Sequence, residues 1–166
     1  MMALQFEVQG RRYGINVADV VEVLPWVDLR PIPGTGPCVV GVVQYHGAFI
    51  PVVDLSRLLA GVPAPQLLST RLVIVRQMRG ESPRLMGVLA EKSTLGMTEV
   101  LDPDQDLHPI PVRTFGDSPL QALASRGHSS VAIVDLETLL SEAEHRTVLG
   151  ALDDRAAQST SGSLNP

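Results

Sequence analysis

The hydrophobic and polar positions of residues 41–59, GVVQYHGAFIPVVDLSRLL, predict two strands, a tight turn between them and a short helix after them. His46 and Gly47 fit the two-residue turn of a β-hairpin, in which Tyr45 would pair with Ala48. Most positions on both faces of this hairpin are apolar. We therefore expect it to be buried on both sides, as in a small barrel or sandwich.

The helix that follows the hairpin has a predicted cap at Asp54. A carboxylate at this position can accept hydrogen bonds from the free N–H groups of the first helical turn. Leu55, Leu58 and Leu59 share one face, which we expect to pack against the hairpin. Gly61 is the predicted end of this helix.

The same pattern recurs near the other end of the chain. The sequence Val-Asp-Leu-x-x-Leu-Leu of residues 53–59 returns at residues 134–140, where Asp135 is the predicted cap. A weaker echo, Glu-Val-Leu, occurs at residues 22–24 and 99–101. These repeats favour two similar subdomains, although such short runs of common residues can also agree by chance.

Residues 14–24 carry a different pattern, with valines at helical spacing after Asn16, which is a predicted helix cap. The apolar arc of this predicted helix consists of Val17, Val20, Val21 and Leu24. Val23 falls outside the arc, next to Glu22, and would be exposed. It is either an isolated surface valine, which is common, or part of a patch that binds a partner.

Further strands are predicted where short runs alternate or are rich in β-branched residues. These runs are residues 4–8, 71–75, 85–89 and 131–134. A C-terminal helix is predicted over residues 143–157, and the polar residues 158–166 are predicted to be disordered.

Composition restricts the class of protein. The 166 residues suffice for one domain or for two small lobes that share a core, and 45% of them are hydrophobic. A net charge of −5 argues against nucleic acid as a partner, because that partner requires clustered Lys and Arg. The sequence contains neither a recognisable signal peptide nor a membrane-spanning run, and the single cysteine, Cys38, fits a reducing compartment. We expect a cytoplasmic protein without direct membrane insertion.

No arrangement of residues in the sequence predicts catalysis. The histidines, at positions 46, 108, 128 and 145, show no metal-ligand spacing. Residues 102–106 are acidic but lack the glycine and the final Glu of a calcium-binding loop, so we interpret them as a solvated loop. Asp54 and Asp135 could form the carboxylate pair of a hydrolase, but helix capping explains both. The sequence therefore predicts a binding module without enzyme activity, cofactor or metal.

Several short motifs follow one another in a fixed order along the chain. They are Tyr13-Gly14, the Val-x-Glu-Val of residues 20–23, Pro31-x-Pro33, the hairpin and cap of residues 41–59, and the Val-Asp-Leu of residues 134–136. Together they resemble the CheW-like coupling domain of bacterial chemosensory systems, whose usual hairpin motif is G-V-x-N-x-R-G-x-x-x-P-V-x-D-L. The similarity covers about residues 3–142 and is strongest in the first half.

This resemblance implies a mainly β fold, with two five-stranded SH3-like barrels, a shared core and short helices. The domain would span residues 3–142, with one lobe of residues 14–79 and another of residues 3–13 and 84–142. The implied function is that of a non-catalytic adaptor between methyl-accepting chemoreceptors and the regulatory domain of a CheA-type histidine kinase. The pathway would serve chemotaxis, or surface sensing through a diguanylate cyclase.

The resemblance also implies where the partners bind. The positions at which family members contact receptor or kinase correspond to Val20, Glu22, Val23, Gly41, Gln44, His46 and Gly47. Gln44 and His46 replace the usual Asn and Arg of the family. Histidine is shorter than arginine and titrates near neutral pH, so a partner group would be held differently. The alternative function is a small β-barrel that binds a ligand or an oligonucleotide, which the few aromatic residues and the negative charge disfavour.

Overall fold

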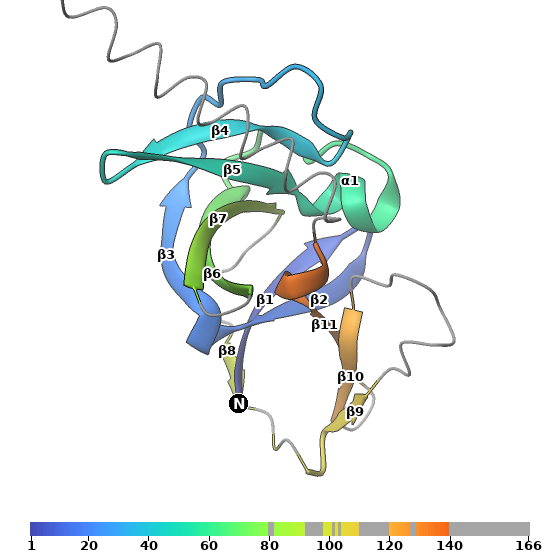
Figure 1. Ribbon diagram of the computed structural model, residues 1–166. Coiled ribbons are helices and arrows are strands. Elements are labelled where there is room, and N and C mark those ends of the chain that lie inside the picture. The colour runs from blue at the N-terminus through green and yellow to red at the C-terminus, as the bar shows by residue number, and fades with distance from the viewer. Residues whose placement is uncertain are drawn as a thin grey trace, which may run out of the picture.

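Two β-sheets packed against one another form most of the molecule (Figure 1). The computed structural model describes residues 1–79, 82–91, 98–100, 102, 104–109, 120–126 and 129–139. The predicted C-terminal helix and the tail after it lie outside the described residues. No helix in the described ranges is long and apolar enough to cross a membrane.

The first sheet has five strands, four of which form two hairpins, β4 with β5 and β6 with β7. In spatial order it contains β3 (Val20–Pro25), β6 (Arg71–Arg79), β7 (Ser82–Ala90), β5 (Ala48–Asp54) and β4 (Val39–Tyr45). All its neighbouring strands are antiparallel except β5 and β7, which are parallel. The helix α1 (Leu55–Ala60) follows β5 directly.

The second sheet has the same core arrangement plus one short edge strand. In spatial order it contains β8 (Thr98–Val100), β1 (Met2–Val8), β2 (Arg11–Asn16), β11 (Ser129–Val134), β10 (Leu120–Arg126) and β9 (Leu107–Pro109). Here β2 and β11 are the parallel pair. In each sheet, one strand of the parallel pair leads directly into a helical turn capped by Asp. These strands are β5, which ends at the cap Asp54, and β11, followed by the cap Asp135, as the sequence repeat predicts.

The mainly β fold is confirmed, whereas closure into SH3-like barrels is not observed. The first sheet ends at β3 and β4, and the second ends at β8 and β9. In the described part of the chain, one isolated bridge between Arg30 and Val42 links the segment after β3 to the opposite edge strand, β4. The edges of the first sheet therefore approach each other without forming a continuous ladder.

Membership of the sheets also differs from the predicted lobe limits. The strand β7 pairs with β6 along its whole length and belongs to the first sheet, although the family resemblance places residues from 84 onward in the second lobe. Conversely, β2 continues past residue 14 within the second sheet. Hydrogen bonding of long antiparallel hairpins, which sequence motifs do not define, sets this division.

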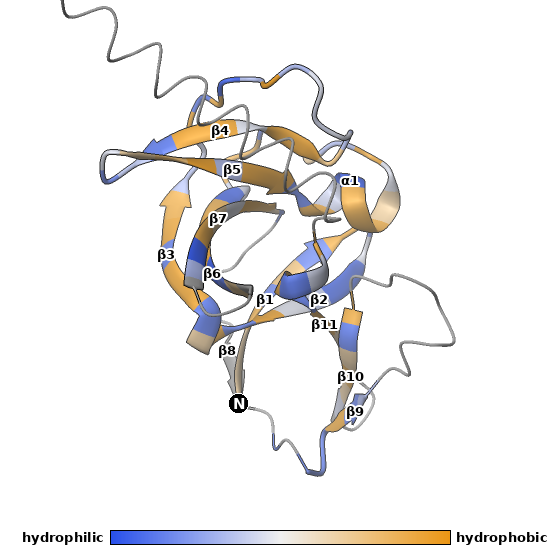
Figure 2. Cartoon of the chain, viewed as in Figure 1, coloured by the Kyte–Doolittle hydropathy of each residue, from blue (hydrophilic) through white to orange (hydrophobic). Residues whose placement is uncertain are grey.

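Each sheet contributes one face to a shared core and has a second core of its own. On β6, Val73 and Val75 enter the shared core, whereas Leu72 and Ile74 face the core of the first sheet. This explains why the run is continuously apolar instead of alternating. Figure 2 shows the resulting hydrophobic colouring along the central strands. The second sheet's own core is built from three alanines and two β-branched residues: Ala3, Ala122, Ala124, Val131 and Ile133.

The helix predicted after Asn16, over residues 17–24, is wrong beyond its first turn. Asn16 caps as expected, since its Oδ1 accepts a hydrogen bond from the Ala18 N–H at 3.1 Å. However, the single 3₁₀ turn η1 (Val17–Asp19) leads at once into β3, which pairs with β6. Valine has a high strand propensity, and the available edge of β6 provides hydrogen bonds that override the helical spacing.

Candidate protein-binding surface

The hairpin of β4 and β5 has the register that the sequence predicts. Tyr45 pairs with Ala48, and the pairing continues in step to Gly41 and Val52. His46 and the following Gly47 have φ angles of 48° and 82°. Positive φ at both central residues defines the type I′ turn that matches the twist of a hairpin.

Gly41 is buried and has a structural role that the motif alone does not reveal. Its φ is 152°, and a Cβ built there would lie 2.5 Å from the carbonyl oxygen of Arg30. The register of β4 and β5 shifts between Val39 and Gly41, which indicates a bulge. Of the seven predicted contact residues, Gly41 is therefore the one that lies beneath other chain segments.

Exposure along β3 differs from the sequence prediction. Val20 and Val23 are half-buried and pack against the shared core, whereas Val21 is 39% exposed. The prediction that Val23 is an exposed residue is therefore wrong. The pairing with β6 shifts register between Val20 and Glu22, so Val21 occupies a bulge and faces outward. Residues 20–25 form a strand with a bulge and not a helix, and the alternation of side chains along this strand determines which valine is exposed.

A hydrogen bond joins β3 to the tip of the hairpin. The Tyr45 hydroxyl donates to Oε2 of Glu22 at 2.5 Å. The Tyr45 ring also makes an edge contact with the His46 ring, with centroids 4.3 Å apart. The bond to Glu22, followed by partial desolvation and the negative charge of that carboxylate, raises the pKa of Tyr45 above its ordinary value.

Several of the predicted contact residues are thus brought close together. Glu22 and the turn residues are exposed, and the hydrogen bond places β3 beside the hairpin tip although they belong to opposite edges of the sheet. Gln44 is also exposed, on the strand that leads into the turn. Sequence reasoning missed Val21 and Tyr45 as members of this surface. A strand assignment for residues 20–25 would have identified Val21, but the contact of Tyr45 depends on tertiary structure.

Both predicted capping residues are confirmed. Oδ1 of Asp54 accepts hydrogen bonds from the N–H groups of Ser56 at 2.9 Å and Arg57 at 3.3 Å. Its Oδ2 accepts from the Ala64 N–H at 2.9 Å, which fastens the loop after α1. Asp135 caps the 3₁₀ turn η2 (Leu136–Thr138) through the Glu137 N–H at 3.0 Å.

These contacts argue against the alternative of a carboxylate pair. Asp54 is buried and lines a pocket with Trp26, whereas Asp135 lines a different pocket with Asp19. Two carboxylates that share a proton or a water must lie in one cleft. The arrangement therefore gives both aspartates structural roles.

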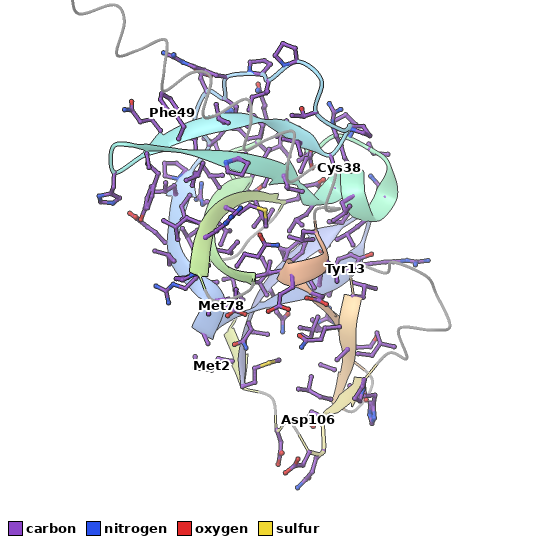
Figure 3. All side chains as sticks on the ribbon, viewed as in Figure 1. Met2, Tyr13, Cys38, Phe49, Met78 and Asp106 are labelled. Carbon is purple, nitrogen blue, oxygen red and sulfur yellow. The ribbon has the colours of Figure 1, made fainter. Side chains whose placement is uncertain are left out.

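The acidic loop before β9 is held by hydrogen bonds between its carboxylates and its own backbone N–H groups. Oδ2 of Asp106 accepts a hydrogen bond from the Asp102 N–H at 2.8 Å, and Oδ1 of Asp102 accepts from the Asp104 N–H at 3.0 Å. Among the residues that the structure describes, no group of three His, Cys, Asp or Glu side chains is suited to hold a metal ion. Figure 3 shows Asp106 at the far end of the molecule from Phe49 on the hairpin.

Comparison with known proteins agrees with the motifs and the fold. Residues 2–144 match the CheW-like domain. The chain belongs to the CheW-like domain family. It is 28% identical to the chemotaxis protein CheW of Rhizobium meliloti over 65% of this chain and 65% of that protein, just under two thirds of the relative's length. It is 27% identical to a probable chemotaxis protein CheW of Rhizobium etli over 85% of this chain and 88% of that protein.

A solved structure shows the same fold. The scaffolding protein TtCheW from Thermoanaerobacter tengcongensis superposes with a TM-score of 0.72 at 22% sequence identity. The match covers 84% of this chain and 87% of that structure. The two-sheet architecture of this CheW-like chain is therefore that of a known scaffold structure.

Proposed function

We propose that this CheW-like protein is a non-catalytic adaptor that couples methyl-accepting chemoreceptors to a CheA-type histidine kinase. The observation that carries the proposal is the match to the CheW-like domain over residues 2–144. The names of the similar proteins, which are those of chemotaxis and scaffolding proteins, support the same assignment. The proposed partners are the cytoplasmic tip of the receptor and the regulatory domain of the kinase.

The surface formed by β3 and the hairpin tip is the proposed contact region. It combines the exposed Val21 with the polar side chains of Glu22, Gln44 and His46. An apolar centre with a polar rim is typical of protein–protein contacts. The Tyr45–Glu22 hydrogen bond brings the hairpin tip beside β3, so one partner can contact both segments.

An adaptor of this kind needs no chemical step. When it binds a receptor and a kinase at once, each partner influences the conformational equilibrium of the other through differential binding. The described residues supply hydrogen-bonding and apolar groups for this purpose. His46, where the usual family motif has Arg, offers the partner a shorter side chain without a permanent charge.

A binding experiment with both partners from the source organism tests the proposal. The full chain is mixed with a purified receptor cytoplasmic hairpin and, separately, with the kinase regulatory domain, and binding is measured by calorimetry. Kinase autophosphorylation is then measured with receptor alone and with receptor plus this protein. We expect binding to both partners and receptor control of the kinase only when the protein is present. Binding to neither partner would refute the adaptor function.

A further inference from the structure

We propose that Tyr45 is a positioning residue of the binding surface, whose hydroxyl holds the Glu22 carboxylate and fixes the hairpin tip against β3. The inference rests on the adaptor function proposed above and adds to it a residue that the motif does not specify. In the usual motif this position, between the Asn and the Arg, accepts any residue.

The tip of the hairpin needs such an anchor. The strand β5 pairs with β7 only from Val52 to Asp54, and before this stretch its ladder is with β4 alone. The outer part of the hairpin is therefore a two-stranded ribbon, which Figure 1 shows extending past β3. An isolated two-stranded ribbon is marginally stable in water, so its orientation depends on contacts with the rest of the protein.

Tyr45 can hold the ribbon through two contacts, one apolar and one a hydrogen bond. Its ring packs at the margin of the first sheet's own core, and its hydroxyl reaches Glu22, 23 residues earlier in the chain, at 2.5 Å. Glu22 pairs with Ile74 in the sheet, so its backbone is fixed by the β3–β6 ladder. The bond thus joins the two-stranded part of the hairpin to a strand that the sheet holds in place.

The contact also sets the direction of the Glu22 side chain. Within the described part of the chain Glu22 forms no ion pair, so no cation there competes with Tyr45 for this carboxylate. An unanchored exposed Glu samples many rotamers, and a partner that binds it must restrict them. Holding the carboxylate and the turn in advance reduces that entropic cost and so increases affinity.

The first variant to test is Tyr45→Phe, which removes one oxygen atom and keeps the ring. We expect affinity for the partner that contacts this surface to fall roughly 3- to 10-fold, the range for loss of one hydrogen bond. Glu22→Ala should weaken binding as well, and the double variant should lose less than the product of the two single effects. Glu22→Gln keeps an acceptor oxygen and should restore part of the affinity that Glu22→Ala loses.

The protein contains a matched control. It has two tyrosines, and the other, Tyr13, stacks on Phe6 in the shared core. Tyr13→Phe also removes one hydroxyl and should leave partner binding unchanged. In this background Tyr45 is the only tyrosine, so absorbance at alkaline pH follows its ionisation alone. Adding Glu22→Gln should lower the pKa of Tyr45, because the negative hydrogen-bond acceptor that raises it is lost.

The outcomes separate this inference from the proposed function. If the wild-type chain binds neither partner, the adaptor function fails, while the tyrosine titration still reports whether the contact exists. If the wild type binds but Tyr45→Phe binds equally well, or its effect multiplies fully with that of Glu22→Ala, the positioning role is refuted. An unchanged Tyr45 titration after Glu22→Gln would refute the contact itself.

Discussion

The side-chain amide of Gln77 donates a hydrogen bond to the backbone carbonyl of Leu136 at 2.8 Å, which joins β6 of the first sheet to the turn η2 after the second. The same nitrogen lies 3.3 Å from the carbonyl oxygen of Glu137. Gln77 and its bond to the Leu136 carbonyl are buried, so this carbonyl is satisfied away from water, whereas the Glu137 carbonyl is only part-buried. A second link runs from the Glu7 N–H on β1 to the carbonyl of Glu91 after β7, at 3.2 Å. The two sheets are therefore connected by polar contacts as well as by the shared core.

Replacing Gln77 with Leu should destabilise the protein by about 1–3 kcal/mol, because the buried Leu136 carbonyl loses its donor while side-chain volume is nearly kept. Chemical denaturation monitored by the fluorescence of Trp26 measures this change. Gln44→Leu is the matched control, since Gln44 is exposed, and should change stability by less than about 0.5 kcal/mol. Equal stability of the two variants would show that the link between the sheets contributes nothing.

The two caps should differ in their contribution to stability. Asp54 is buried and accepts three backbone hydrogen bonds, whereas Asp135 is half-buried and caps its turn through the Glu137 N–H. We expect Asp54→Ala to cost about 2 kcal/mol and Asp135→Ala about 1 kcal/mol. Thermal unfolding of both variants in parallel provides the comparison. A larger loss for Asp135→Ala would contradict the ranking by number of hydrogen bonds.

The sequence was sufficient for the elements whose signals are local. The turn of His46 and Gly47, the hairpin register and the caps at Asp54 and Asp135 depend on neighbouring residues, and the structure confirms them. The strand β3 could not be predicted in this way, because its valines fit a helix as well as a strand. The edge of β6, about 50 residues away in the chain, decides between them.

The candidate surface was only partly predictable for the same reason. Family motifs predict β3 and the hairpin as contact segments, but they do not show that Gly41 lies under Arg30. They also did not show that Tyr45 reaches Glu22. Both contacts connect segments that are distant in sequence, and short motifs contain no information about such pairs.

The two glycines of the hairpin should respond differently to alanine. Gly41→Ala places a methyl group 2.5 Å from the Arg30 carbonyl oxygen, so the chain must shift, and we expect a loss of more than about 2 kcal/mol. Gly47 has open space around its Cβ position and a φ of 82°. Gly47→Ala should therefore cost only the backbone strain, about 1 kcal/mol. Denaturation midpoints measured under identical conditions test this difference, and a greater cost at Gly47 would contradict it.

The valines of β3 should separate folding from binding. Val21 is exposed in the bulge, so Val21→Asp should keep the unfolding midpoint within a few degrees while weakening partner binding, because a charge replaces apolar contact area. Val23 packs against the shared core, so Val23→Asp should destabilise the protein by about 1–3 kcal/mol through burial of a carboxylate. Calorimetric unfolding and receptor binding are measured on the same two samples. A folded Val23→Asp variant that has lost binding would support the exposed-valine interpretation, and it would show that the pairing of β3 with β6 does not hold that side chain in the core.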